Sequence, residues 1–174
     1  MDWLKTPGVR ALGVVLFAIL TAVGAQVSLP MVPVPMTLQS LAVVLAGGVL
    51  GPRGGVAAMG LYLAAAAVGL PVLSDGRGGM AALTGPTAGY LVGFVLAAWA
   101  SGEAGRRGWL RRPLPGIVIL SAAHLSILLP GAAWLALDIG WTAAMSGGFT
   151  PFLAGAVVKS SAAWLILTAA IRRG

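Results

Sequence analysis

The sequence predicts an all-α integral membrane protein with six transmembrane helices, and its composition and its segmentation both point to this class. Of its 174 residues, 59% are hydrophobic and 9% are charged, and the mean hydropathy is +0.97. A soluble domain has roughly 25% charged residues, so this chain cannot cover its surface with polar groups. Apolar runs recur along the whole chain with no linker between them, so we expect one domain over residues 1–174.

Six apolar runs are the expected spans, although some are short. They cover residues 11–27, 37–50, 55–68, 87–101, 114–137 and 151–171. A bilayer-crossing helix needs about 20 residues, so helices formed by the second to fourth runs must extend into the flanking segments to cross the bilayer. A reading with five spans and one re-entrant piece therefore stays open. In the fifth run we expect a kink at Pro130.

The segments between the runs carry helix-breaking or polar residues. Residues 28–36 hold three prolines and cannot form a helix interior. Gly51-Pro52-Arg53-Gly54 separates the second and third runs, and residues 69–86 form a long glycine-rich loop. Residues 102–113 are strongly basic, and residues 138–150 are expected to be a loop.

The basic residues predict the orientation. With six spans and a cytoplasmic amino terminus, one basic residue outside the spans, Arg77, lies on the outer side, and nine lie inside: Lys5, Arg10, Arg53, Arg106, Arg107, Arg111, Arg112, Arg172 and Arg173. Cytoplasmic loops are enriched in Lys and Arg, so both termini are expected in the cytoplasm. The same placement explains the net charge of +7 without a nucleic-acid partner.

Lys159 is the residue around which a functional hypothesis forms. It lies eight residues past Pro151, roughly 12 Å into the last helix. A lysine near the bilayer centre costs about 2.5–3.5 kcal/mol on insertion scales, and no carboxylate stands three or four residues away. We expect the carboxylate of a small ligand to be its partner. Snorkelling to the interface, or pairing with another helix, is the alternative.

Other polar residues gather on the outer side of the predicted topology. As ligand contacts we select Thr37 and Gln39 after the proline-rich segment, Asp75 and Arg77 in the long loop, and Thr84 and Tyr90 around the fourth span. Each could instead serve a cap or a turn. Together with Lys159 they predict a pocket with one positive end and several neutral hydrogen-bonding groups, which suits a small amphipathic acid.

Several function classes find little support in the residues. The chain has no cysteine, one histidine and four acidic residues, so no metal site, cofactor site or acid–base cluster is expected. His124 lies mid-span, two residues from Ser126, and is expected to be a hydrogen-bonded packing residue. Residues 155–160 resemble the end of a phosphate-binding loop, but Val158 replaces the glycine that this loop needs before its lysine. Any ATPase must therefore be another subunit.

Small residues form stripes on two of the expected helices. Ala18 and Ala22 lie four residues apart on the first span, and Gly89 and Gly93 on the fourth. Such stripes let helices approach closely. They indicate either packing within this chain or a docking surface for another membrane subunit.

Four strings, in order along the chain, resemble one known family. They are VPVPMTLQSLAVVLAGGVLGPRGG (32–55), YLAAAAVGLPVL (62–73), LTGPTAGYLVGF (83–94) and GFTPFLAGAVVK (148–159). The chain is identified as a member of the BioY family, the biotin-specific S components of energy-coupling-factor (ECF) transporters. The resemblance covers nearly the whole chain.

The resemblance implies a prokaryotic cell-membrane protein with six helices and a biotin pocket on the extracytoplasmic side, with loops one and three closing over it. It implies partnership with a transmembrane coupling subunit and two ATP-binding subunits, and it gives Ala18 and Ala22 a docking role. The lysine's role carries over to Lys159. The family's Pro-Gly-Asp-x-x-Lys motif departs here, since Ala154 and Ala156 replace the proline and the aspartate.

Biotin's chemistry agrees with the selected residues. Its carboxylate needs a cation, which Lys159 offers, and its ureido group needs partners such as Thr37, Gln39, Tyr90 or Asp75. An S component for another small vitamin is the near alternative. An intramembrane enzyme would need clustered acids or histidines, and a structural subunit without a ligand would leave Lys159 unexplained.

Overall fold

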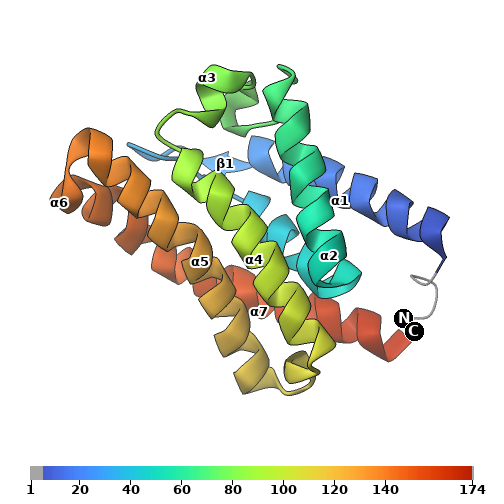
Figure 1. Cartoon of the computed structure of the whole chain (residues 1–174). Coiled ribbons are helices and arrows are strands. Elements are labelled where there is room, and N and C mark those ends of the chain that lie inside the picture. Colours follow the sequence, from blue (N-terminus) through green and yellow to red (C-terminus); the bar gives the residue numbers. More distant parts are fainter. Residues whose placement is uncertain (1–5, 174) are drawn as a thin grey trace.

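The computed structural model describes residues 6–173, of which most are helical (Figure 1). The helices are α1 (Pro7–Gln26), α2 (Gln39–Ala67), α3 (Met80–Leu83), α4 (Ala88–Arg106), α5 (Pro113–Ile139), α6 (Trp141–Ala144) and α7 (Thr150–Arg173). Two 3-10 turns, η2 (Ser74–Gly76) and η3 (Trp109–Arg111), and a π-helical segment, η4 (Met145–Phe149), connect them. The strands β1 (Ser28–Leu29) and β2 (Met36–Thr37) pair antiparallel.

Four helical stretches of the described chain are long and apolar enough to cross a membrane: Pro7–Gln26, Gln39–Ala67, Pro113–Ile139 and Trp141–Ala170. The helix α4 falls outside this set, yet it packs mainly against α2 and α5 in the centre of the bundle. The mostly helical fold predicted from composition is confirmed. The predicted second and third spans are the two halves of α2.

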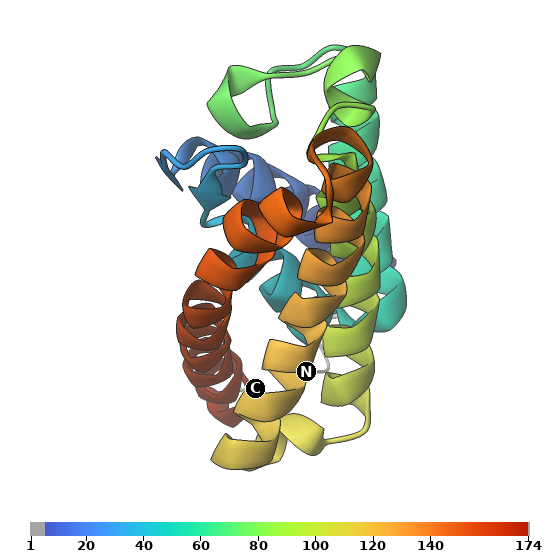
Figure 2. The same cartoon turned by 90° about the vertical axis from the view of Figure 1, so that its left-hand side faces the viewer.

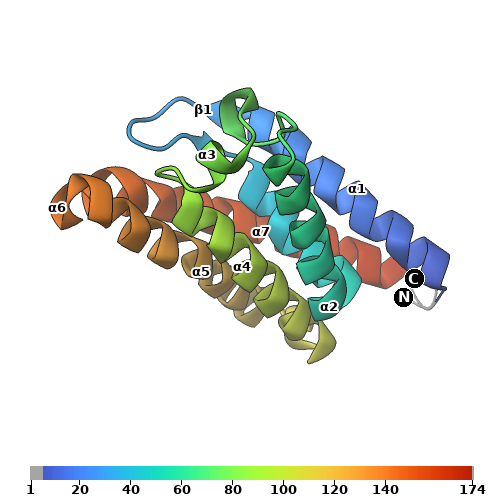
Figure 3. The same cartoon turned by 45° about the horizontal axis from the view of Figure 1, so that its top comes forward.

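The helix α2 turns back on itself at Gly51. Gly51 has φ +75° and ψ 176°, a backbone conformation that favours glycine, and Pro52 begins the second half. A Cβ added at Gly55 would lie 2.7 Å from the Cα of Gly47, although a straight helix would hold these residues roughly 12 Å apart. The two halves therefore pack closely, as the cyan and teal ribbons show (Figures 1 and 3).

The prediction of a loop over residues 138–150 is wrong. The helix α5 runs through Pro130 to Ile139, and after Gly140 the chain is helical again through α6 and η4 into α7. Gly140, with φ +83°, breaks the helix. The alanines and the absence of proline from residues 141–150 then allow helical backbone to resume.

The connecting segments separate into two ends of the bundle (Figure 2). One end carries the β1–β2 segment, the loop around α3, and α6. The other carries the turn of α2, η3 and the end of α7 (Figure 1). Close helix contacts hold α2, α4 and α5 together: a Cβ added at Gly93 of α4, for example, would lie 2.5 Å from the Cα of Ile127 on α5.

Candidate functional site

A pocket lies beneath the β1–β2 segment and the loop that follows α2. Its lining residues come from both of these segments and from α2, α4, α5 and α7. They are Val34, Pro35, Thr37, Gln39, Ser40, Leu73, Ser74, Thr87, Tyr90, Leu91, Phe94, Ile127, Leu128, Phe152 and Lys159. The pocket is therefore largely apolar, with a few polar side chains and one cation, which is the usual make-up of a small-molecule site.

The Lys159 ammonium group is held where β2 meets α2. It donates hydrogen bonds to the carbonyl oxygen of Thr37 (2.6 Å) and to Oγ of Ser40 (3.0 Å). An ammonium group has three N–H donors, so one remains for another acceptor. Among the described residues, the carboxylates of Asp75 and Glu103 form ion pairs with arginines, and no carboxylate pairs with Lys159. The cation therefore lies at the pocket wall with donor capacity to spare.

A chain of hydrogen bonds orients Gln39. The Thr37 hydroxyl donates to Oε1 of Gln39 (3.2 Å), and Nε2 of Gln39 donates to the Tyr62 hydroxyl. Tyr62 in turn donates to the Val72 carbonyl oxygen (3.2 Å). Both Gln39 and Tyr62 are buried, so the network fixes the amide at the pocket wall.

Tyr90 joins α4 to the π-helical segment. Its hydroxyl donates to the Gly148 carbonyl oxygen at 2.6 Å, and its ring lies 6.4 Å from that of Phe152, measured between centroids. A Cβ added at Gly148 would lie 2.5 Å from the Tyr90 hydroxyl oxygen, so glycine is needed at this contact. Tyr90 and Phe152 thus form a rigid aromatic part of the wall.

The remaining predicted site residues do not line the pocket. Asp75 and Arg77 are exposed and line a separate hollow beside the proline-rich segment. A guanidinium nitrogen of Arg77 lies 3.9 Å from a carboxylate oxygen of Asp75. Arg77 also donates to the carbonyl oxygen and to Oγ of Ser74, each at 3.2 Å. Thr84 is exposed and donates to the Met80 carbonyl oxygen at 3.0 Å. Of the seven residues selected from the sequence, the structure brings together Lys159, Thr37, Gln39 and Tyr90.

Several lining residues were not selected from the sequence. Ser40 follows Gln39 directly and is the partner of Lys159 across 119 positions, and Ser74 precedes Asp75. Both are polar neighbours of selected residues, which is the only signal that could have identified them. Tyr62, which orients Gln39 from behind, gives no such signal, because it lies within an alanine-rich helical run.

His124 is a buried packing residue, as predicted. Its Nδ1 atom lies 3.1 Å from the Leu120 carbonyl oxygen and 2.9 Å from Oγ of Ser160 on α7. Its side chain is 3% exposed. The Ser126 hydroxyl donates its hydrogen to the Ala123 carbonyl oxygen, so it does not donate a hydrogen bond to His124.

The small-residue stripe on α1 faces the core of this chain. Ala18 is 8% exposed, and Ala22 is partly buried against the core cluster. The opposite face of α1 exposes large apolar side chains, among them Leu16 and Ile19. The docking role of Ala18 and Ala22 stays a prediction.

Comparison with known proteins agrees with the fold and the resemblance. The model of the BioY family matches residues 5–174. A probable biotin transporter BioY of Pyrococcus horikoshii is 39% identical over 155 residues, covering 88% of this chain and 90% of that protein. A biotin transporter BioY of Rhizobium etli is 39% identical over 165 residues, covering 86% and 85%.

Among solved structures, the S-component for biotin from an ECF-type ABC transporter is similar with a TM-score of 0.84 and 25% identity. That match covers 95% of this chain and 92% of the other. The family match spans nearly the entire chain, and its four apolar helical stretches fit a multi-pass membrane protein. This chain belongs to the BioY family.

Proposed function

We propose that this chain is the biotin-binding S component of an ECF transporter, and that its pocket receives biotin through the end carrying the β1–β2 segment. The observation that carries this proposal is the Lys159 ammonium group at the wall of an otherwise largely apolar pocket. The relatives are described as biotin transporters, so the role is binding and uptake and not catalysis.

In this proposal the biotin carboxylate takes the remaining N–H of Lys159, and the two bonds from Lys159 to Thr37 and Ser40 keep the ammonium group in place. The apolar side chains, such as Phe94 and Leu128, pack against the ring and the aliphatic chain. The ureido group meets Gln39 and Tyr90. Ala156 is buried and its side chain has no polar group, so position 156 makes no acidic contact with the ligand. In this proposal Gln39 and Tyr90 make the polar contacts to the ureido group instead.

The segments above the pocket supply its cover. Val34 and Pro35 come from the β1–β2 segment, and Leu73 and Ser74 from the loop after α2. We propose that these two segments close over biotin. Asp75, Arg77 and Thr84 then approach the ligand only when that loop moves, because in this structure they lie outside the pocket.

Six membrane-crossing segments complete the proposal: α1, the two halves of α2, α4, α5 and α7. The nine-to-one bias of basic residues supports cytoplasmic termini in a prokaryotic inner membrane. The sequence carries no ATP-binding signature, so we propose that ATP-driven transport relies on a transmembrane coupling subunit and two ATP-binding subunits as partners.

Equilibrium binding tests the ligand directly. Detergent-purified protein is titrated with biotin, thiamine and riboflavin. The proposal expects biotin to bind at least about a hundredfold more tightly than the others, because only biotin combines a carboxylate with a matching apolar length. Tighter binding of another vitamin would assign the pocket to that vitamin and reject biotin.

A further inference from the structure

A large cleft lies at the opposite end of the molecule from the biotin pocket. It lies between α1, the turn of α2 and the end of α4, and we call it the arginine cleft. It is lined by Arg10, Gly48, Val49, Leu50, Gly51, Pro52, Arg53, Val56, Trp99, Gly102, Glu103, Gly105 and Arg106. It shares no lining residue with the biotin pocket.

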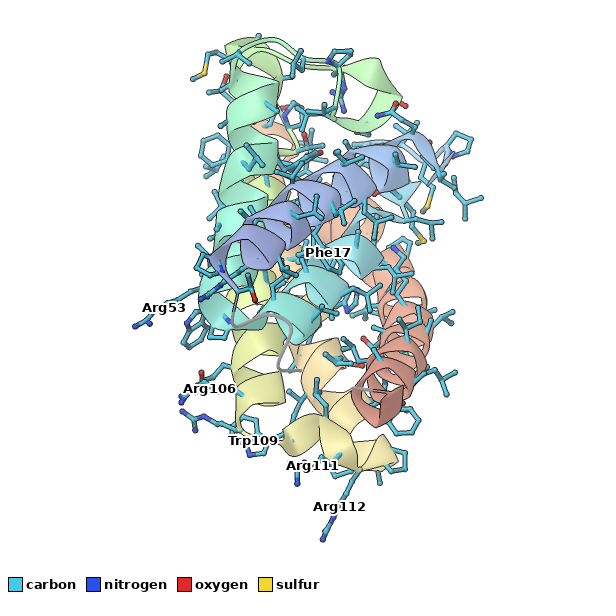
Figure 4. All side chains as sticks on the ribbon, turned by 90° about the vertical axis from the view of Figure 1, so that its right-hand side faces the viewer. Phe17, Arg53, Arg106, Trp109, Arg111 and Arg112 are labelled. Atoms are coloured by element: carbon cyan, nitrogen blue, oxygen red, sulfur yellow. The ribbon has the colours of Figure 1, made fainter. Side chains whose placement is uncertain are left out.

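Three arginines from three different elements converge on this cleft. Arg10 extends from α1, Arg53 from the turn of α2 and Arg106 from α4, and all three are exposed. Arg10 and Arg53 also line a second hollow that adjoins the cleft between α1 and α2. Figure 4 shows Arg53 and Arg106 on the same side of the molecule.

The cleft carries an excess of positive charge. Among residues 6–173, Glu103 is the one acidic residue that lines it, and this carboxylate accepts hydrogen bonds from Arg106 (2.6 and 2.8 Å) and from Arg107 (2.6 Å). Two guanidinium groups therefore already share the one carboxylate. Arg10 and Arg53 provide the surplus cations, and guanidinium groups bind phosphate oxygens through paired N–H donors.

An exposed apolar strip runs from the cleft along α4. Trp99, which is 55% exposed, lines the cleft, and Leu96, one turn earlier on α4 and away from the arginines, is 48% exposed. Tryptophan is enriched at the membrane–water interface. A cationic recess bordered by an exposed apolar strip matches a molecule with a phosphate headgroup and acyl chains, and basic pockets between transmembrane helices bind such headgroups.

We propose that the arginine cleft binds an anionic phospholipid, with its phosphate at Arg10 and Arg53 and its acyl chains along Trp99 and Leu96. This inference rests on the membrane placement of the helices and is independent of the transported ligand. A soluble phosphate ester would use the arginines but not the apolar strip, and an acidic segment of a partner protein would need no lipid. Both are alternatives that the experiment separates.

Native mass spectrometry of the detergent-purified chain, titrated with dioleoyl phosphatidylglycerol, gives the lipid affinity. Arg10→Gln/Arg53→Gln removes the surplus cations of the cleft. Arg111→Gln/Arg112→Gln is the matched control, because it removes the same charge from exposed arginines at the same end, outside the cleft. We expect the first variant to bind phosphatidylglycerol roughly tenfold or more weakly, and the control to change the affinity less than about twofold.

Two further arms define the ligand. Dioleoyl phosphatidylcholine should bind the wild type at least about tenfold more weakly than phosphatidylglycerol, and glycerol phosphate should not displace the lipid at equal concentration. Trp99→Ala should also lower the affinity for phosphatidylglycerol. Thermal unfolding of every sample reports folding, and Arg53→Gln alone replaces the double variant if that variant fails to fold.

The proposal is overturned if both double variants lose affinity equally, since the attraction is then diffuse. It is also overturned if phosphatidylcholine binds as tightly, or if glycerol phosphate displaces the lipid. Unchanged lipid affinity in Arg10→Gln/Arg53→Gln rejects the lipid. If the same variant also fails to co-purify with the proposed coupling and ATP-binding subunits when it is expressed with them, the cleft is assigned to a protein.

Discussion

The ammonium group of Lys159 lies 2.6 Å from the carbonyl oxygen of Thr37, a residue 122 positions earlier in the chain. This bond joins α7 to the junction of β2 and α2. The lysine side chain is thus held by a backbone atom and by Ser40 before any ligand arrives. Such preorganisation lowers the entropy cost of binding a carboxylate.

Replacing Lys159 by alanine should remove the attraction for a carboxylate. A hydrogen bond to a charged group contributes about 1.5–3 kcal/mol, so biotin affinity should fall roughly 10- to 100-fold. Biotin amide, which lacks the charge, should bind the wild type less well than biotin does, and the variant should discriminate little between the two. Calorimetric titration of both ligands against both proteins measures this coupling. Equal affinities of folded wild type and variant for biotin would exclude Lys159 as the anchor.

Tyr62 should affect biotin binding although it does not line the pocket. Tyr62→Phe removes the hydroxyl that holds Nε2 of Gln39, so the amide can turn away from its bound position. We expect biotin affinity to fall about tenfold, with an effect that largely disappears when Gln39 is already alanine. Additive effects in this double-mutant cycle would mean that Tyr62 acts independently of Gln39.

Close packing of α2 against α4 should make Gly47 sensitive to a single added methyl group. A Cβ at Gly47 would collide with the Ala98 backbone and with Oγ of Ser101. Gly47→Ala should destabilise the protein by about 1–3 kcal/mol, measured by thermal unfolding in detergent. Gly60→Ala is the control in the same helix, because a Cβ there meets no atom within 4 Å. Comparable losses in both variants would contradict this packing.

Ala22→Trp separates the two readings of the α1 stripe. A docking role predicts normal biotin binding and a normal unfolding temperature, with loss of uptake in cells that contain the coupling and ATP-binding subunits. A packing role predicts lower stability of the isolated chain, because Ala22 packs against the core cluster. The resemblance favours docking, so we expect uptake to be lost, and the packing of Ala22 against the core predicts a lower unfolding temperature as well; loss of uptake at a stability that still supports biotin binding is the outcome that assigns the docking role. Leu16→Ala, on the exposed face of α1, is the control.

The proposed cover can be followed by distance measurement, because the chain has no cysteine of its own. Spin labels attached to cysteines introduced at Val32 and Met80, which are 92% and 62% exposed, report the separation of the two segments. Biotin should shorten the distance and narrow its distribution. The same distribution with and without biotin would indicate a preformed pocket with a fixed opening.

The sequence by itself determined the membrane class, the approximate positions of the apolar segments and the importance of Lys159. These properties are local: hydropathy decides which segments avoid water, and a charge within such a segment must find a partner. The turn of α2 was also predictable, since Gly51-Pro52 interrupts an apolar run. The helical backbone of residues 141–149 was missed, because glycine-rich sequence alone does not distinguish a loop from a helix that neighbouring segments support.

The tertiary structure alone decided which polar groups share the pocket. Ser40 and the Thr37 carbonyl oxygen meet Lys159 only because α7 crosses the start of α2, and Tyr62 reaches Gln39 only because α2 folds back at Gly51. Asp75 and Arg77 were chosen for their polarity, yet the loop directs them to another hollow. Contacts between residues far apart in the chain depend on which helices pack together. No pattern of neighbouring residues in a single sequence indicates that packing.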